Sequence, residues 1–193
     1  MATPLPFQDN PMALRATVYK VELQVSDLDR QVFETISLSL ARNPSETAER
    51  LLVRLLAYAL NVCEGLAFGR GISNDEEATL WQRDLSGVLR LWIEVGLPDE
   101  RVLRRAAGRA DNVVLYTYGG RAAAVWWAQN GAALSQMKNL RVVDLPSAFT
   151  QPLAALATRN IALQVTIQDG EMWVSVNDAT LHVRPEVRSS GGL

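Results

Sequence analysis

A strand–helix–strand unit in the middle of the chain constrains the fold more than any other feature. Residues 88–95 alternate between apolar and polar side chains, as a β-strand does, and residues 113–118 form a second, largely apolar strand. Between them, residues 98–110 place acidic side chains in the first turn of a helix and arginines in its later turns, an order that the helix dipole favours. This succession predicts an α/β domain built on a mixed sheet.

Alternation divides residues 88–95 into two unlike faces. The apolar face consists of Leu89, Leu91, Ile93 and Val95. The other face consists of Val88, Arg90, Trp92 and Glu94. Two interpretations of this second face stay open: it forms a functional site, or Arg90 and Glu94 pair as ions and solvate an open sheet.

Two β-hairpins are predicted at the ends of the domain. Apolar and polar residues alternate over residues 17–25 and again over residues 32–40. Near the C-terminus, two shorter alternating runs within residues 161–176 flank Asp169-Gly170, a strong two-residue turn signal. Together with the central unit, the hairpins indicate a compact single α/β (α+β) domain, in which helices flank a mixed central sheet.

A helix is predicted over residues 43–61, because Asn43 is a good N-cap and Glu46, three residues later, completes a capping box. Its core-facing stripe consists of Ala48, Leu51, Leu52, Leu55, Leu56 and Ala59. Glu46 points away from this stripe and is expected to pair with Arg50 on the surface. Glu49 lies on the margin of the buried face, where a carboxylate can look into a cleft.

Two further side-chain patterns are candidates for a contact surface. Arg101, Arg104, Arg105 and Arg109 fall within an outer stripe of ~140° on the helix over residues 98–110, taking ~100° per residue. This stripe either holds phosphates or is a solvated charged face. Trp126 and Trp127 are adjacent on a helix over residues 121–137 and cannot share one face, so one is expected in the core and the other at a groove or contact.

The chain is expected to hold one domain, because 193 residues fit one large domain and no linker divides them. Residues 12–187 are assigned to this domain. Residues 1–11 contain three prolines without periodicity and are expected to be a disordered extension, and residues 188–193 a disordered tail.

The residue counts exclude several kinds of chemistry. Cys63 and His182 are the only cysteine and the only histidine, so a zinc site of the usual ligand types cannot form. His182 lies between two apolar neighbours on a strand and is expected to face solvent, which sets serine–histidine hydrolysis aside. No nucleotide cofactor is expected. Catalysis would have to rest on carboxylates, arginines and a metal ion.

Charge and hydropathy limit the possible partners and the possible cellular compartment. The net charge is −2 and the pI about 5.5, whereas dedicated duplex-DNA binders are usually basic. No apolar run approaches the roughly 18 residues that a membrane span needs, and the N-terminal residues lack a secretory pattern. A lone cysteine permits no internal disulfide, so we expect a cytoplasmic protein with no membrane contact.

Five segments, in order, resemble the YaeQ family of bacterial proteins. They are MALRATVYK, ARNPSETAER, LWIEVGLPDER, TYGGRAAAVWW and LQVTIQDGEMW. The resemblance runs from Met12 to about Val183 and implies a restriction-endonuclease-like fold, a variation of the PD-(D/E)xK nuclease core. In that core, a strand carboxylate and an upstream aspartate bind Mg²⁺, often with a helix glutamate. A lysine two residues beyond the strand carboxylate steadies the attacking water.

Carried onto this sequence, the resemblance implies a Mg²⁺ site. Glu94 is the strand carboxylate, Asp84 the upstream aspartate with Asp75 in reserve, and Glu49 the helix glutamate. Gly96 stands at the lysine position.

Positive charge at this site would therefore come from Arg101 or Arg104 on the next helix, or from Arg90 on the strand. Arginine can stabilise a phosphate but cannot act as a base. Members of the family often carry a proline and an acidic residue where Ala78 and Thr79 stand, and an acidic residue where Arg90 stands.

Two functions follow. The first is a Mg²⁺-dependent phosphodiesterase that acts on nucleic acid through Glu49, Asp84, Glu94 and Arg104. The second is a non-catalytic module that binds nucleic acid or a protein partner. Its contact surface would consist of Arg90, Trp92, Arg101, Arg105 and Trp126.

Overall fold

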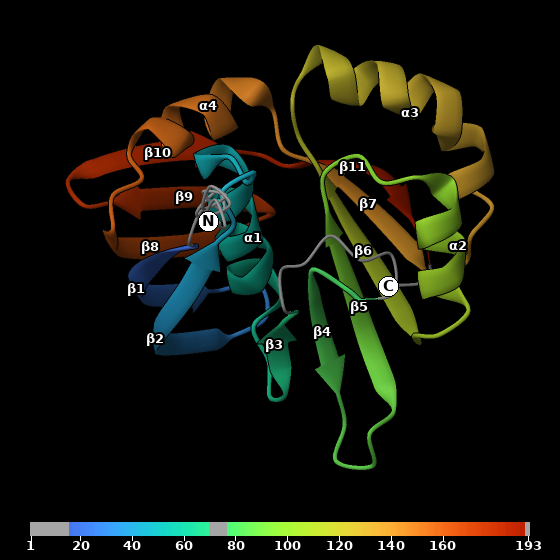
Figure 1. Ribbon diagram of the computed structural model, residues 1–193, viewed down its shortest axis with the longest axis horizontal. Helices are drawn as coiled ribbons and strands as arrows, with labels where there is room; N and C mark the ends of the chain where they lie inside the picture. The colour runs from blue at the N-terminus through green and yellow to red at the C-terminus, as the bar shows by residue number, and fades with distance from the viewer. Residues whose placement is uncertain (1–15, 70–76, 192–193) are drawn as a thin grey trace, which may run out of the picture.

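The computed structural model describes residues 16–69 and 77–191, which form one mixed α/β domain with two sheets and four helices (Figure 1). The strands are β1 (Thr17–Asp27), β2 (Val32–Arg42), β3 (Leu66–Phe68), β4 (Leu80–Arg83), β5 (Leu89–Val95), β6 (Asn112–Thr117), β7 (Leu140–Asp144), β8 (Asn160–Gln168), β9 (Glu171–Val176), β10 (Ala179–Val183) and β11 (Glu186–Ser190). The helices are α1 (Ala48–Asn61), α2 (Glu100–Ala107), α3 (Arg121–Leu134) and α4 (Ser147–Ala155). The predicted α/β class is confirmed.

The first sheet unites the two predicted hairpins. Its strand order is β10-β9-β8-β1-β2, with β1 and β8 side by side in parallel. Both hairpins are confirmed, and the turn residues Asp169 (φ 53°) and Gly170 (φ 72°) adopt the left-handed conformation that a two-residue hairpin turn requires. Alternating burial along β1 and β8 turns one face of this sheet toward the core.

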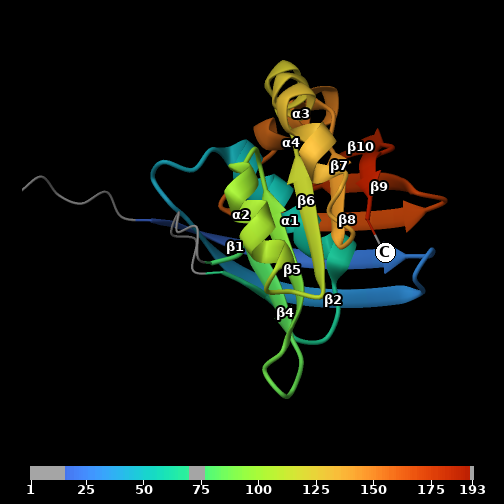
Figure 2. The same cartoon turned by 90° about the vertical axis from the view of Figure 1, so that its right-hand side faces the viewer.

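The second sheet has the order β11-β7-β6-β5-β4-β3, and β5, β6 and β7 run parallel, joined by α2 and α3. The expectation of one central sheet is wrong: there are two mixed sheets, and their strands run across one another (Figure 2). Alternation specifies which side of a hairpin is buried but not which strand it pairs with, because pairing is decided by contacts far apart in sequence.

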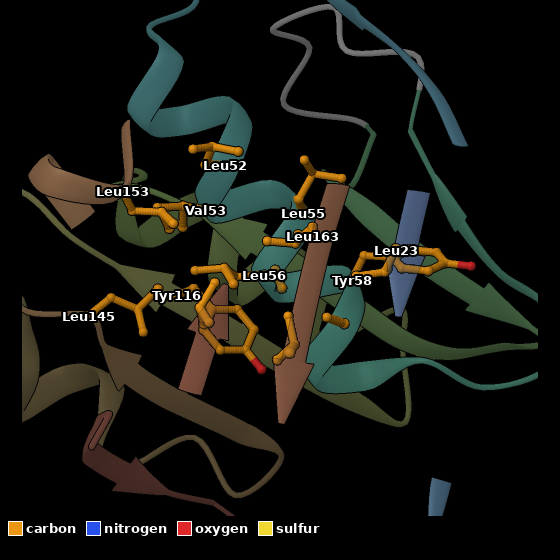
Figure 3. Close-up of a cluster of buried hydrophobic side chains, with 14 of the residues drawn as sticks. Leu23, Leu52, Val53, Leu55, Leu56, Tyr58, Tyr116, Leu145, Leu153 and Leu163 are labelled. Atoms are coloured by element: carbon orange, nitrogen blue, oxygen red, sulfur yellow. The ribbon is translucent and has the colours of Figure 1, made fainter. Parts of the chain in front are cut away.

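The helix α1 lies between the two sheets and forms the main core. Leu52, Leu55 and Leu56 pack among side chains of both sheets, including Leu163 of β8 and Tyr116 of β6 (Figure 3). A second core lies on the opposite face of the second sheet, beneath α2 and α3, and contains Trp92, Leu103, Leu115, Leu134 and Leu140. The second sheet is therefore covered on both faces, as expected for parallel strands.

Two helices differ from the prediction. α1 begins at Ala48 rather than at Asn43, because the Thr47 side chain accepts a hydrogen bond from the Arg50 amide and acts as the N-cap. Asn43 instead closes a turn by accepting from the amide of Glu46. The sequence did not predict α4, which contains Pro152 in its interior, a residue that disfavours helix.

The predicted disordered tail is wrong for residues 188–190, which belong to β11 and pair antiparallel with β7. Arg188 anchors this strand by donating to the buried carboxylate of Asp144 at 3.2 Å. The expected N-terminal extension, residues 1–11, lies outside the described residues. Within residues 16–69 and 77–191, no helix is long and apolar enough to cross a membrane.

Candidate functional site

Glu94, the strand carboxylate that the resemblance implies, lies on β5 among the buried residues of the second sheet and is 8% exposed. The indole Nε1–H of Trp92 donates to its Oε1 at 2.7 Å, and the Thr79 hydroxyl donates to its Oε2 at 2.8 Å. Burial raises the pKa of Glu94, although both hydrogen bonds and the nearby Arg50 charge oppose the shift. Both carboxylate oxygens are thus bound by internal donors.

Thr79 lies opposite Glu94 on the neighbouring strand. Leu80 of β4 pairs with Ile93 of β5 in an antiparallel register, so the preceding residue, Thr79, comes opposite Glu94. The resemblance places an acidic residue at this position in many family members. A hydroxyl in its place leaves Glu94 without a second carboxylate across the strand pair.

Arg50 of α1 supplies the positive charge next to this carboxylate, where Arg90, Arg101 or Arg104 was expected. Its guanidinium donates to the Val95 carbonyl, and its Nη1 lies 3.0 Å from the point where a Cβ on Gly96 would be. Gly96 has a φ of +108°, which favours glycine. The helix arginine therefore borders the lysine position itself. Arg50 could have been identified from the sequence by the combination of a glycine at position 96 and an arginine near the start of the preceding helix.

The expected surface pair between Glu46 and Arg50 is only partly correct. The two side chains are 3.9 Å apart, but the Glu46 side chain is buried and lies closer to Arg54, at 2.8 Å. Glu46 is held by Arg54, which leaves Arg50 directed toward β5.

Asp84 does not join Glu94. It lies in the turn between β4 and β5, at the opposite end of β5, where its Oδ1 accepts from the Ser86 amide, the Ser86 hydroxyl and the Val88 amide. Its Oδ2 accepts from Arg90 at 2.9 Å. These hydrogen bonds, led by that of Ser86, lower the pKa of Asp84 to about 2. Asp84 is a turn residue and does not lie beside Glu94, as the expected shared metal site would require.

Glu49 is engaged elsewhere as well. Its Oε1 accepts from the Thr150 hydroxyl of α4 at 2.6 Å, which joins the two helices. Asp75, the reserve ligand, lies outside the described residues. Within the described part of the chain, no three acidic, histidine or cysteine side chains are grouped closely enough to hold a metal ion. The described residues therefore do not fit the expected Mg²⁺ site.

The expected contact surface is also not assembled. Trp92 is 2% exposed and lies in the second core, because α2 and α3 cover that face of the sheet. Arg90 does not pair with Glu94 but with Asp84 and Asp111, each at 2.7 Å. Neither interpretation of an open polar face is correct.

The arginine stripe on α2 is exposed, but two of its four cations have acidic partners: Arg101 pairs with Asp99 and Arg104 with Glu100. Arg105 also makes an interaction within the chain. Trp126 is half-buried and donates its indole N–H to the Pro98 carbonyl at 3.1 Å. Trp127 is half-buried against the same core. The expectation that one tryptophan lies in the core and the other at a groove is therefore wrong.

His182 is exposed, as predicted, and pairs with Glu171 at 2.8 Å.

A groove of about 520 Å³ opens between the two sheets, on the face of the second sheet opposite Glu94. It lies where the C-terminal ends of β1, β8 and α1 approach one face of β5, β6 and β7. We call it the inter-sheet groove. Its apolar wall includes Leu60, Leu91, Val114, Val143, Met172 and Val187. A cavity of this size with apolar walls and several polar groups has the properties of a small-molecule site.

Three polar side chains on the floor of the inter-sheet groove share one face of β6 and β7. Asn112 and Tyr116 flank Val114 on β6, and Arg141 of β7 pairs directly with Val114. The Tyr116 hydroxyl accepts from the Asn61 amide at 2.7 Å, which leaves its own proton available to an acceptor. Burial raises the pKa of Tyr116, and the positive charge of Arg141 opposes that shift.

The carboxylates that line the inter-sheet groove are all engaged within the protein. Asp27 pairs with Arg30 at 2.6 Å, Asp111 with Arg90 at 2.7 Å, and Glu171 with His182 at 2.8 Å, while Asp29 accepts from two backbone amides. Arg141, by contrast, has no ion pair among the described residues.

Comparisons with known proteins agree on one family. The family model described as "YaeQ protein" matches residues 12–185. The chain is 46% identical to the uncharacterized protein YaeQ of Escherichia coli (strain K12) over 172 residues, which are 89% of this chain and 95% of that protein. It is similar to the crystal structure of YaeQ protein from Xanthomonas axonopodis pv. citri, with a TM-score of 0.87, 46% identity and coverage of 91% and 99% of the two chains. A second crystal structure, of YaeQ protein from Pseudomonas syringae, matches with a TM-score of 0.85, 38% identity and coverage of 91% and 97%. The chain belongs to the YaeQ family.

Proposed function

We propose that this chain is a metal-independent binding protein, built on a variant of the restriction-endonuclease-like core, and that its ligand occupies the inter-sheet groove. The order α1, β3, β4, β5, α2 and β6 supports such a core, since it places Glu94 on the strand before the crossover helix, as the resemblance implies. In this chain the Glu94 carboxylate is held inside the domain by hydrogen bonds from Trp92 and Thr79. Of the two functions that the sequence left open, this is the non-catalytic binding module. Its binding surface is now the inter-sheet groove.

The observation that carries the proposal is the set of contacts around Glu94. A carboxylate that binds Mg²⁺ has to offer a lone pair to the ion, usually beside another carboxylate and several waters. Here Trp92 and Thr79 donate to its two oxygens, Thr79 stands where the other carboxylate would be, and the nearest cation is Arg50. These contacts favour a structural role for Glu94 over a catalytic role.

The net charge and the paired arginines argue against nucleic acid as the ligand. Phosphate-backbone binding relies on cations that are free to replace counterions. On α2, Arg101 and Arg104 are already neutralised by neighbouring carboxylates. The inter-sheet groove, in contrast, combines an apolar wall with available donors. An exposed free thiol at Cys63 is compatible with the reducing cytoplasm, the compartment we propose for this function.

The metal-free part of the proposal is tested by titrating Mn²⁺ and Mg²⁺ into the wild-type chain and Glu94→Gln by calorimetry, with parallel cleavage assays on single- and double-stranded DNA and RNA. We expect no sub-millimolar metal binding and no cleavage that EDTA abolishes. Sub-millimolar binding that disappears in Glu94→Gln, together with metal-dependent cleavage, would show the nuclease to be the correct function.

The binding part is tested with N-phenyl-1-naphthylamine, an uncharged fluorescent probe of apolar sites. Val187 lines the inter-sheet groove and is 47% exposed, so Val187→Trp fills the groove with little cost to folding. Val125 on α3, 50% exposed, gives the matched control Val125→Trp. We expect Val187→Trp to weaken probe binding at least about tenfold and Val125→Trp to leave it unchanged. Equal binding by all three proteins would contradict the groove as the binding site.

A further inference from the structure

We infer that the inter-sheet groove selects a small amphipathic anion, with its acidic head group on Arg141 and its apolar body against Val143 and Val187. This inference rests on the proposed function and specifies its ligand. The groove supplies two separate environments for such a molecule, a cationic donor on its floor and several apolar side chains around it.

The head-group site follows from strand register. Arg141 pairs with Val114 across β6 and β7, and Asn112 and Tyr116 lie two residues away on either side of Val114. Adjacent strands are ~4.8 Å apart and residues i and i+2 ~6.6 Å apart, so the three side chains rise from one small patch of the sheet. Guanidinium, phenol and amide groups are all able to donate, and together they match a carboxylate or phosphate oxygen set.

Four carboxylates and three guanidiniums line the groove, so its formal charge is slightly negative. A simple count would favour a cation. However, each carboxylate is engaged within the protein, Asp27 and Asp111 by arginines of the groove itself. An anion can approach Arg141 without breaking any ion pair of the described residues, and no carboxylate offsets the charge of Arg141 as Asp27 and Asp111 offset those of the other groove arginines. Arg141 is therefore the charged side chain of the groove at which we place an anion.

The size of the groove limits the rest of the ligand. A volume of about 520 Å³ falls within the ~300–1,000 Å³ typical of small-molecule sites. The wall residues Leu91, Val143 and Val187 come from three strands of one sheet, and Met172 faces them from the other sheet. A body of several carbon atoms next to one anionic group would occupy both environments at once.

The test uses a pair of probes that differ in one charge. 1-Anilinonaphthalene-8-sulfonate carries a sulfonate, whereas N-phenyl-1-naphthylamine has the same ring system without it. We expect Arg141→Gln to weaken binding of the sulfonate about tenfold and to leave the neutral probe unchanged, since one charge-assisted contact is lost. Arg121→Gln, an exposed arginine at the opposite end of β6, is the matched control and should change neither affinity.

Displacement identifies the head group. Octanoate and octyl phosphate should each be compared with 1-octanol as competitors of the bound sulfonate. Displacement by octanoate or by octyl phosphate alone assigns a carboxylate or a phosphate, and displacement by both assigns their shared anionic chemistry. Equal displacement by 1-octanol, or equal sulfonate affinity in wild type and Arg141→Gln, would overturn the anion while leaving the binding function intact. If Val187→Trp also fails to alter either probe, the binding function itself is wrong.

Discussion

The indole of Trp92 donates to the carboxylate of Glu94 at 2.7 Å, two residues along the same strand. This contact is local in sequence, yet both side chains are buried beneath α2 and α3. Residues i and i+2 share one face of a strand, which permits the contact. Burial then makes it obligatory, because an unpaired indole N–H or carboxylate in the interior costs free energy. The pair is a structural element of the second core.

Glu94→Gln should keep or increase stability at neutral pH, whereas Glu94→Ala should lower the free energy of unfolding by about 2–3 kcal/mol. Glutamine can still accept from Trp92 and meet the Thr79 hydroxyl, but alanine leaves both donors unpaired. Urea unfolding of the three proteins at pH 7 measures the difference. A loss in Glu94→Gln as large as that in Glu94→Ala would mean that the negative charge itself stabilises the fold.

The pH dependence of stability should also change in Glu94→Gln. The folded-state pKa of Glu94 is raised above its ordinary value of 4.5, so its contribution is fully present below that value and is lost as pH rises through the folded-state pKa. The wild type should therefore lose stability relative to Glu94→Gln as the pH is raised from about 4.5 toward neutrality. Parallel unfolding curves across this range would contradict the raised pKa.

A lysine at position 96 should destabilise the protein by about 1–3 kcal/mol. Gly96 has a φ of +108°, and a Cβ there would meet the Arg50 guanidinium at 3.0 Å. Gly96→Lys should be measured beside Gly96→Ala and the double variant Gly96→Lys with Arg50→Ala. We expect the double variant to lose less than the sum of the single changes, because removing Arg50 relieves the contact but not the backbone strain. Strict additivity would show that the two positions do not interact.

Asp84→Ala should loosen the β4–β5 turn without affecting any metal response. The carboxylate accepts from the amides of Ser86 and Val88, so both amides should exchange hydrogen faster in the variant. Asp111→Ala, which removes only the other partner of Arg90, should leave these two amides protected.

The carboxyl of Asp84 should titrate with a midpoint near 2 by NMR, because its folded-state pKa is lowered to about 2. Its stabilising effect is then present above its ordinary value of 3.8 and is lost only as pH falls through about 2. A midpoint near the ordinary value would contradict the hydrogen bonds of the turn.

Asp29→Ala should lower the free energy of unfolding by about 1 kcal/mol through loss of a link across the first sheet. Asp29 lies in the β1–β2 turn and accepts from the amides of Asp169 and Gly170, at 2.8 and 2.9 Å, in the β8–β9 turn. Amide exchange at these two residues should accelerate in Asp29→Ala and less so in Asp29→Asn, which retains one acceptor. Unchanged exchange in both variants would exclude this link.

Local features of the fold were predictable from sequence because each depends on nearby residues. Alternation and the Asp169-Gly170 turn identified both terminal hairpins, and the apolar stripe identified α1. The side-chain alternation along β5 was correct as well, since Trp92 and Glu94 do share a face. Alternation does not report what covers that face, so a polar surface was expected where α2 and α3 lie.

The functional residues depended on contacts that the sequence does not contain. The choice of Asp84 followed from its separation from Glu94 along the chain, but the β4–β5 register brings Thr79 to Glu94 and leaves Asp84 in the turn. Arg50 reaches the lysine position from a helix more than forty residues earlier. Register and helix placement are properties of the whole fold and cannot be derived from local spacing.

The sequence by itself determined the α/β class, the hairpins and the family, because these follow from periodicity, turn residues and sequence segments. Only the tertiary structure decided that two sheets form, that the Glu94 carboxylate is held inside, and that Arg141 and Tyr116 meet an apolar wall in one groove. The physical reason is distance along the chain: the pairing of β1 with β8 and the packing of α1 between the sheets bring together residues whose proximity no local pattern encodes.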